Sequence, residues 1–192
     1  MKRKIVTLMT AILLLGLSVS NAGIVVLDFE SLSTPGTGYT CIGLSYSEDS
    51  FNLEAVPSGE LCYFHTEHES FAGSTALYHR ALGGYPDTML THADGLPFDL
   101  LSLDISEPRP DWLSVGVSLI GTKSDNSTVT SSFTLDGVFG FEMHTLETFT
   151  DLIELRLVGQ SYQYDNITFD VIPEPTTIVL FGLGVLLLRK QT

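Results

Sequence analysis

The densest group of side chains that could bind a metal ion lies at His65-Thr66-Glu67-His68-Glu69. Imidazole and carboxylate groups are ligands for zinc and similar ions. On a strand, the two histidines would point to opposite faces, and the neighbouring residues lack the apolar period of a helix that would bring them together. We therefore expect a solvated loop, and a metal site here would require His79 or His92 to converge on the same point.

Motifs of common catalytic sites are missing from the sequence. It has no Gly-x-Ser-x-Gly elbow, no glycine-rich phosphate loop and no His-Glu-x-x-His pair. Carboxylates are abundant, with 23 Asp and Glu residues, but a glycosidase pair is identified by the distance between its carboxyl groups and not by sequence. We expect that the protein is not an enzyme.

Charge and hydropathy are unevenly distributed along the 192 residues. The net charge is −14 and the mean hydropathy is +0.25. Residues 1–22 carry +3 and residues 172–192 carry +1, which leaves −18 on residues 23–171. A surface this acidic excludes binding to nucleic acid or to an anionic bilayer through a basic patch.

The N-terminus has the three parts of a secretory signal peptide. Lys2, Arg3 and Lys4 precede an apolar run, and Ser20 and Ala22 occupy the small-residue positions of a cleavage site. We predict a signal peptide over residues 1–22. The alternative, an uncleaved anchor, is disfavoured because the apolar run is shorter than the roughly 20 residues that span a bilayer.

Residues 23–171 are expected to form one domain of short strands. Segments rich in β-branched and aromatic residues are separated by Gly, Pro, Asp, Asn and Ser. Apolar residues recur at every second position in 113–121 and again in 152–158. We predict strands at 24–29, 43–46, 51–55, 61–65, 76–79, 98–105, 113–121, 128–135, 152–158 and 167–171. Many short strands with little helix imply an antiparallel β-sandwich.

The C-terminus combines three features in a fixed order. Pro173, Glu174 and Pro175 precede an apolar stretch at 176–188, and the basic pair Arg189 and Lys190 follows. The prolines end any regular element, the apolar stretch is short for a membrane span, and the basic pair favours the cytoplasmic side. An ordinary C-terminal anchor would also fit, and both interpretations place the middle domain outside the cytoplasm.

This order resembles the PEP-CTERM sorting signal of Gram-negative bacteria. The resemblance implies that an exosortase, a membrane transpeptidase-like enzyme, cuts near the Pro-Glu-Pro motif in bacteria that make exopolysaccharide. It also implies transient membrane association through residues 176–188 before processing, and a place at the cell surface or in the extracellular matrix afterwards.

The middle domain has a second, looser resemblance, to secreted PEP-CTERM proteins with a jelly-roll, galactose-binding-like domain. The residues that carry it are Leu27-Asp28-Phe29-Glu30-Ser31-Leu32, the run from Pro97 to Asp104, Thr134-Leu135-Asp136-Gly137, and the run from Tyr164 to Thr168. The resemblance implies a jelly roll. Related jelly rolls often bind carbohydrate and often hold a structural calcium near the first and last strands, although a fold by itself does not establish a function.

Four residues near the two ends of that domain could hold such a calcium. Asp28, Glu30, Asp165 and Asn166 supply the carboxylate and amide oxygens that Ca²⁺ prefers, and a jelly roll places these ends side by side. In the alternative, Asp165 and Asn166 only form the turn into the last strand. No other cofactor is expected.

Sugar binding would use aromatic rings together with polar side chains that reach hydroxyl groups. The amphipathic rings available are Tyr63, Tyr78, Tyr85, Trp112, Tyr162 and Tyr164. Any one of them is more often a core or edge residue than a platform for a ligand. The ligand-binding residues therefore stay unassigned at the level of sequence.

The two cysteines, Cys41 and Cys62, allow a single intramolecular disulfide. An oxidising extracytoplasmic compartment favours that pairing. The alternative is two separate buried thiols.

These features together predict an exported, non-enzymatic protein of the cell surface or extracellular matrix, with an association with exopolysaccharide and weak glycan binding. The competing function is a secreted, glycoside hydrolase-like enzyme that acts on matrix polysaccharide. A third possibility is a structural protein with no specific ligand, but the sequence lacks the internal repeats that would support it.

Overall fold

A computed structural model describes residues 23–80, 86–112, 114–159 and 162–172. Within them, Gly23–Ile172 form one unit. The predicted signal peptide and the predicted sorting signal, with Pro173, Glu174, Pro175, Arg189 and Lys190, lie outside the described residues. In the part that is described, no helix is long and apolar enough to cross a membrane.

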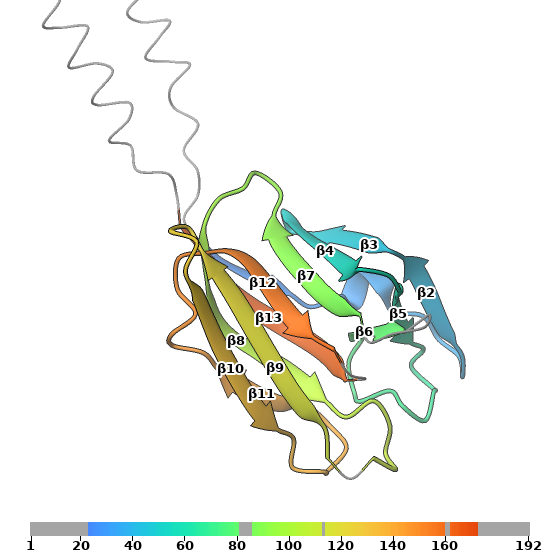
Figure 1. Ribbon diagram of the computed structural model, residues 1–192. Coiled ribbons are helices and arrows are strands. Elements are labelled where there is room, and N and C mark those ends of the chain that lie inside the picture. Colours follow the sequence, from blue (N-terminus) through green and yellow to red (C-terminus); the bar gives the residue numbers. More distant parts are fainter. Residues whose placement is uncertain (1–22, 81–85, 113, 160–161, 173–192) are drawn as a thin grey trace, which may run out of the picture. The chain divides into compact units, whose positions relative to one another are not determined.

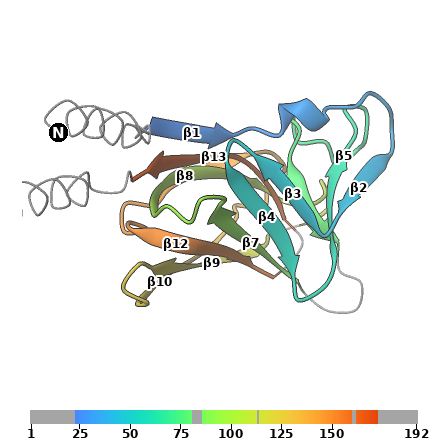
Figure 2. The same ribbon diagram turned by 90° about the horizontal axis from the view of Figure 1, so that it is seen from above.

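The domain is all-β and antiparallel, as the sequence predicts. Its described residues form thirteen strands and one short 3₁₀ turn, Glu30–Leu32. The strands arrange into two layers, which are joined at one point by the pairing of Leu152 with Phe98. The two layers can be followed in the views of Figures 1 and 2.

Layer A has the strand order β3-β4-β7-β12-β9-β10. Its members are β3 (Ser45–Glu48), β4 (Phe51–Val56), β7 (Asp87–His92), β12 (Leu152–Val158), β9 (Gly116–Lys123) and β10 (Thr128–Thr134).

Layer B has the order β2-β5-β6-β13-β8-β11, and β1 pairs with the second half of β13. Its members are β1 (Gly23–Leu27), β2 (Tyr39–Gly43), β5 (Glu60–Phe64), β6 (Leu77–Arg80), β13 (Gln163–Val171), β8 (Phe98–Ser106) and β11 (Glu142–Thr145).

The chain moves between the layers repeatedly. It crosses from β2 to β3, from β4 to β5, from β6 to β7, from β7 to β8 and from β8 to β9, and again before β11, between β11 and β12, and after β12. Strands that are neighbours in a layer are therefore mostly distant in sequence. This connectivity is the jelly-roll arrangement that we expected, and it lets residues from many parts of the chain meet on one surface.

The core lies between the layers because each strand turns every second side chain inward. In β4, Phe51, Leu53 and Ala55 are buried while the residues between them are not. The Phe51 ring of layer A stacks on Phe169 of layer B at a centroid distance of 4.2 Å, and it contacts Phe98 edge-on at 5.2 Å. These rings hold the two sheets face to face.

Three strands were missed by the sequence analysis, β2, β7 and β11. In β7 the inward residues are Thr88, Leu90 and His92, so polar side chains interrupt the apolar alternation. β2 and β11 contain no fully buried residue. Backbone pairing with β5 and β8 holds them in place.

Candidate functional site

The outer surface of β2, β5 and β6 carries a cluster of aromatic rings. In β5, Leu61 and Tyr63 belong to the core, so Phe64 points to the opposite side of the sheet. The strand register places Tyr39 opposite Phe64 and Cys62 opposite Tyr78. The three strands occupy one end of the molecule in Figure 1. Their pairing brings together rings that are up to 39 positions apart in sequence.

These rings stack on one another. The Phe64 ring lies 4.5 Å from Tyr78 and 4.5 Å from His68, with interplanar angles of 11° and 21°. Tyr39 is 47% exposed, and the Arg80 guanidinium lies over its ring at 5.7 Å from the centroid. We call Tyr39, Phe64, His68, Tyr78 and Arg80 the aromatic face. It presents apolar ring surface next to a cation on a partly exposed sheet.

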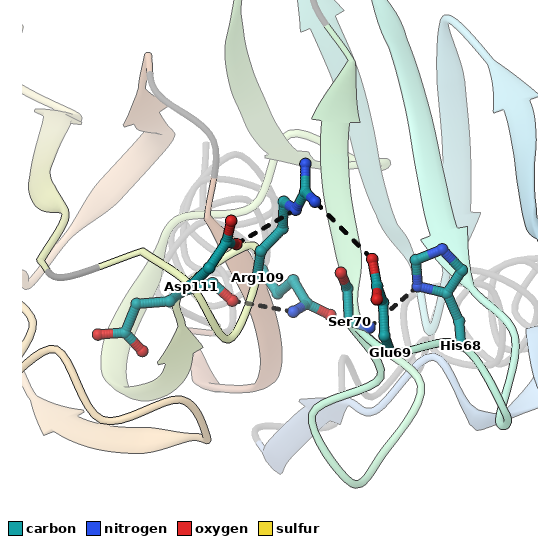
Figure 3. A network of polar contacts seen from close by, with 7 residues as sticks. His68, Glu69, Ser70, Arg109 and Asp111 are labelled. Carbon is teal, nitrogen blue, oxygen red and sulfur yellow. Dashed lines mark hydrogen bonds and ion pairs between the residues drawn. The ribbon is translucent and has the colours of Figure 1, made fainter.

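Charged and polar groups surround the aromatic face. Arg80 pairs with Glu60 at 3.8 Å. Figure 3 shows the Arg109 guanidinium between Asp111 and Glu69, the residue that follows His68, at 3.4 Å and 3.7 Å. Exposed pairs of this kind contribute little to stability. They leave guanidinium and carboxylate groups in solvent, where they can hydrogen-bond to a ligand.

The Tyr78 hydroxyl stays protonated under ordinary conditions. Burial raises the pKa of Tyr78 above its usual value of 10.0, and the neighbouring Tyr39 hydroxyl adds to the rise. Arg80 opposes the shift. The hydroxyl is therefore a neutral group that can both donate and accept hydrogen bonds.

Of the rings named from the sequence, only Tyr78 is in this cluster. Tyr63, Tyr162 and Tyr164 are core residues, and Tyr85 lies outside the described residues. Trp112 is 38% exposed and follows Asp111 in the loop after β8. The sequence analysis did not include Tyr39, Phe64 or His68 among the candidate sugar-binding rings. The pairing of β2 with β5 brings Tyr39 to Phe64, and the loop after β5 brings His68 to it.

The two cysteines face each other across β2 and β5. Cys41 and Cys62 are register partners, and their Sγ atoms are bonded. The structure thus contains a Cys41–Cys62 disulfide and not two separate thiols. It ties the edge strand that carries Tyr39 to the strand that carries Phe64.

The predicted calcium residues are only partly brought together. Asp165 and Asn166 lie inside β13, at a break in its register with β8, so they do not form a turn before the strand. The Asn166 backbone N–H donates to Asp165 Oδ1 at 2.8 Å, and its side-chain amide donates to Asp104 Oδ2 at 3.0 Å. Asp104 is thus an additional oxygen-bearing residue at this position that the sequence analysis missed.

Glu30 and Asp28 of the predicted set point to different neighbours. The Glu30 carboxylate accepts the backbone N–H of Thr75 at 3.0 Å. The Asp28 carboxylate accepts the backbone N–H of Glu30 at 3.1 Å, and its charge contributes to a raised pKa of Glu48, of which burial is the main cause. The oxygens of Glu30, Asp165 and Asp104 already accept protein hydrogen bonds, and calcium would have to replace some of these.

Asp165 is the most strongly perturbed carboxyl of this group. Burial raises its pKa from 3.8 to about 7, hydrogen bonds from Ser74 and the Asn166 backbone lower it, and the carboxylates of Glu30 and Asp104 raise it further. A bound divalent cation would favour the ionised form of Asp165. A calcium ion at Asp28, Glu30, Asp165 and Asn166, as proposed from the sequence, would therefore change the pH dependence that Asp165 gives to stability.

The histidines do not converge on a metal site. His65 Nε2 hydrogen-bonds Thr40 Oγ1 at 2.9 Å, while His68 Nδ1 accepts the Ser70 N–H at 3.0 Å. His79 and His92 are buried on the core side, where His79 contacts Thr88. The loop therefore positions His68 against Phe64 and does not form a cluster of metal ligands.

A shallow groove of about 380 Å³ lies at the ends of β9, β10 and β12. It is lined by Gly116, Val117, Ser118, Ser132, Phe133, Thr134, Val158 and Gly159. This lining includes no carboxylate, and the Phe133 ring is stacked on His144 at 3.8 Å. The groove thus offers no glycosidase pair.

No protein-family model matches the sequence, and no curated protein matches it. Solved structures with a similar fold include a xylan-binding domain of family 22 (TM-score 0.43, 13% identity, covering 71% of this chain and 97% of that chain). Another is a family 32 carbohydrate-binding module of C. perfringens NanJ in complex with galactose (TM-score 0.41, 9% identity, covering 70% of this chain and 99% of that chain). A third is a family 29 carbohydrate-binding module of Piromyces equi (TM-score 0.41, 6% identity, covering 70% of this chain and 90% of that chain). At these identities and TM-scores, the similarity does not identify a ligand for this chain.

Proposed function

We propose that the domain is a non-enzymatic glycan-binding module, exported and sorted to the cell surface or extracellular matrix by its terminal segments. The observation that carries the proposal is the aromatic face on β2, β5 and β6. A sugar ring has an apolar C–H surface and a rim of hydroxyl groups. It is therefore complementary to partly exposed rings that are bordered by hydrogen-bonding side chains.

In this proposal, Tyr39 contributes the apolar contact. It is the most exposed ring of the aromatic face, and Arg80 lies against it. Arg80, which lies over the Tyr39 ring, and its ion-pair partner Glu60 would hydrogen-bond the hydroxyl groups of the sugar. Because residues 23–171 carry −18, a neutral glycan is favoured over an acidic polysaccharide.

The direct experiment measures binding of the protein to the neutral exopolysaccharide of the producing bacterium by pull-down and calorimetry. Tyr39→Ala should weaken binding about two- to tenfold, if a ring contact contributes roughly 0.5–1.5 kcal/mol. Met143→Ala is the matched control because Met143 is an exposed apolar residue on β11, outside the aromatic face. Equal binding by both variants and the wild type would contradict the assignment of this face.

The sorting part of the proposal is supported by the order of Pro173-Glu174-Pro175, the apolar stretch and the basic pair. Replacement of Glu174 by Ala should leave the protein membrane-associated in a host that has an exosortase. Mass spectrometry of the exported protein reports whether its C-terminus is cut near the motif. A wild-type protein that keeps Arg189 and Lys190 after export would favour an ordinary membrane anchor.

The same preparations test the alternative enzymatic function. Release of reducing sugar ends from the native polysaccharide by the wild-type protein would support a hydrolase. We expect binding without release.

A further inference from the structure

Three carboxylates from separate parts of the chain meet beside the end of β8. Glu107 follows the last residue of β8, Asp136 lies in the loop after β10, and Glu142 begins β11. Each offers one oxygen, and these oxygens all lie within 4.8 Å of one another. The pairing of Glu142 with Ile105 places β11 next to the end of β8. These three residues do not overlap with the calcium set predicted from the sequence.

The loop backbone uses one oxygen of each carboxylate. Glu107 Oε1 accepts the N–H of Gly137 at 3.0 Å, and Glu142 Oε1 accepts the N–H of Asp136 at 2.8 Å. Asp136 Oδ1 accepts the N–H of Val138 at 2.7 Å. The second oxygens of the three carboxylates accept no hydrogen bond from the described residues, and of these oxygens Glu142 Oε2 has an ion-pair neighbour, His144 Nε2 at 3.7 Å.

Glu107 gives independent evidence that a partner is missing. Its side chain is fully buried, with 0% exposure, and its Oε2 atom has no hydrogen-bond partner in the part of the chain that the structure describes and no access to solvent. None of the ion pairs among the described residues includes Glu107. A buried carboxylate with no compensating positive charge is strongly disfavoured.

We propose that Glu107, Asp136 and Glu142 bind a calcium ion. Ca²⁺ is coordinated by oxygens at 2.3–2.6 Å, so two oxygens that contact one ion lie at most about 5 Å apart, and the three carboxylates meet this condition. The ion neutralises Glu107 and supplies the partner that its Oε2 lacks. Water completes the coordination on the side of Asp136, which is exposed.

The nature of the donors selects a hard cation. All three ligands are carboxylate oxygens, which suit Ca²⁺ better than a zinc ion, whose protein sites are dominated by His and Cys. His144 Nε2 is buried and has no hydrogen-bond partner among the described residues, but it lies 3.7 Å from Glu142 Oε2 as an ion-pair neighbour, and the His144 ring stacks on Phe133. In our assignment, His144 orients Glu142 and does not coordinate the ion.

Calcium bound here would add a link between segments that already pair or hydrogen-bond with one another. It would link the end of β8 to the loop that precedes β11, and Glu107 is also tied to β13 because its carbonyl accepts the Gln163 side-chain amide at 3.0 Å. Extracellular modules bind Ca²⁺ with dissociation constants of about 10⁻⁴–10⁻³ M. We expect an affinity in that range and a structural role for the ion.

The test is calcium titration of the full-length, chelator-treated protein by calorimetry, together with thermal unfolding. Calcium at about tenfold above the dissociation constant should raise Tm by about 3–6 °C. Glu107→Gln should weaken calcium binding at least tenfold. Asp136→Asn should also weaken calcium binding at least tenfold. This variant distinguishes loss of the site from misfolding, because Asp136 is exposed and an asparagine oxygen can still accept the Val138 N–H.

Controls separate this site from other acidic groups. Glu147→Gln, an exposed substitution after β11, should bind calcium like the wild type. Calcium binding that is lost in Asp165→Asn but kept in Glu107→Gln and Asp136→Asn would overturn the proposal in favour of the set predicted from the sequence. The absence of any calcium binding at 10 mM, or binding of Zn²⁺ without binding of Ca²⁺, would also overturn it.

Discussion

The raised pKa of Asp165 predicts an unusual dependence of stability on pH. Its carboxyl is buried, accepts hydrogen bonds from Ser74 and the Asn166 backbone, and lies near two further carboxylates, Glu30 and Asp104. Asp165→Asn removes the ionisable group and keeps an oxygen that can accept one of these hydrogen bonds. The variant therefore isolates the cost of placing a negative charge at this position.

The size of the effect follows from the shift in pKa. A change from 3.8 to about 7 is about 3 units, and each unit corresponds to 1.36 kcal/mol. Structural relaxation around a buried charge reduces the total, so we expect about 2–4 kcal/mol. Since the pKa is higher in the folded state, the folded protein binds the proton more tightly. This contribution to stability is complete below about pH 4 and is lost as the pH rises towards 7.

The assay is guanidinium chloride unfolding at pH 4.5 and pH 8 with a chelator present, followed by far-UV circular dichroism and by the fluorescence of Trp112, the only tryptophan. The difference in unfolding free energy between Asp165→Asn and the wild type should increase by about 2–4 kcal/mol, in favour of the variant, from pH 4.5 to pH 8. Asp94→Asn, in the exposed turn after β7, should follow the wild type at both values.

A difference between Asp165→Asn and the wild type that stays constant with pH would refute this reasoning, because Asp165 would then titrate as it does in the unfolded chain. Calcium extends the same experiment. If the set predicted from the sequence binds an ion, calcium at pH 8 should stabilise the wild type more than Asp165→Asn, in which only the site at Glu107, Asp136 and Glu142 is intact. An unchanged Tm of the wild type at millimolar calcium would rule out both that set and the Glu107 site.

Three further predictions concern the disulfide, a buried histidine and a tightly packed glycine. Replacing Cys41 and Cys62 by serine should lower the unfolding free energy by about 3 kcal/mol, the value for a loop of this length; an unchanged denaturation midpoint would contradict it. Burial lowers the pKa of His79 below 6.5, so stability should be lost as the pH falls below that value, and a His79→Gln variant should lose less in the same pH series. Gly121→Ala places a methyl group 2.7 Å from Leu152 Cδ2 and should destabilise the fold by about 1–3 kcal/mol in chemical denaturation.

The predicted strands with clear alternation were found where the sequence placed them, within a few residues. The expected strand over 113–121 is Gly116–Lys123 in the described part of the chain, and that over 152–158 matches β12. Alternation identifies a strand when one of its faces is apolar and buried. β7 was missed because its inward-facing position 88 is a polar residue and does not show the apolar alternation. Thr88 is accommodated in the core by hydrogen bonds to His79 and Tyr164.

The candidate sites were much less predictable than the strands. Tyr78 was among the rings considered, but Tyr39 and Phe64 join it only through the pairing of β2, β5 and β6. Glu107 and Asp136 could not be distinguished by sequence from the other acidic residues. In the structure, Glu107 and Asp136 differ from the other acidic residues in two ways. Glu107 is fully buried, and the turn at Asp136 directs backbone N–H groups at the carboxylates.

The sequence by itself determined the all-β class and the concentration of negative charge between two basic, apolar ends, since both depend on residue type and local spacing. Only the tertiary structure decided which distant residues each carboxylate contacts. Asp104 reaches Asn166 across 62 positions, and Glu107 reaches Gly137 across 30. A period of two assigns a side chain to a face of its strand, but the order of strands in a jelly roll decides which faces become neighbours.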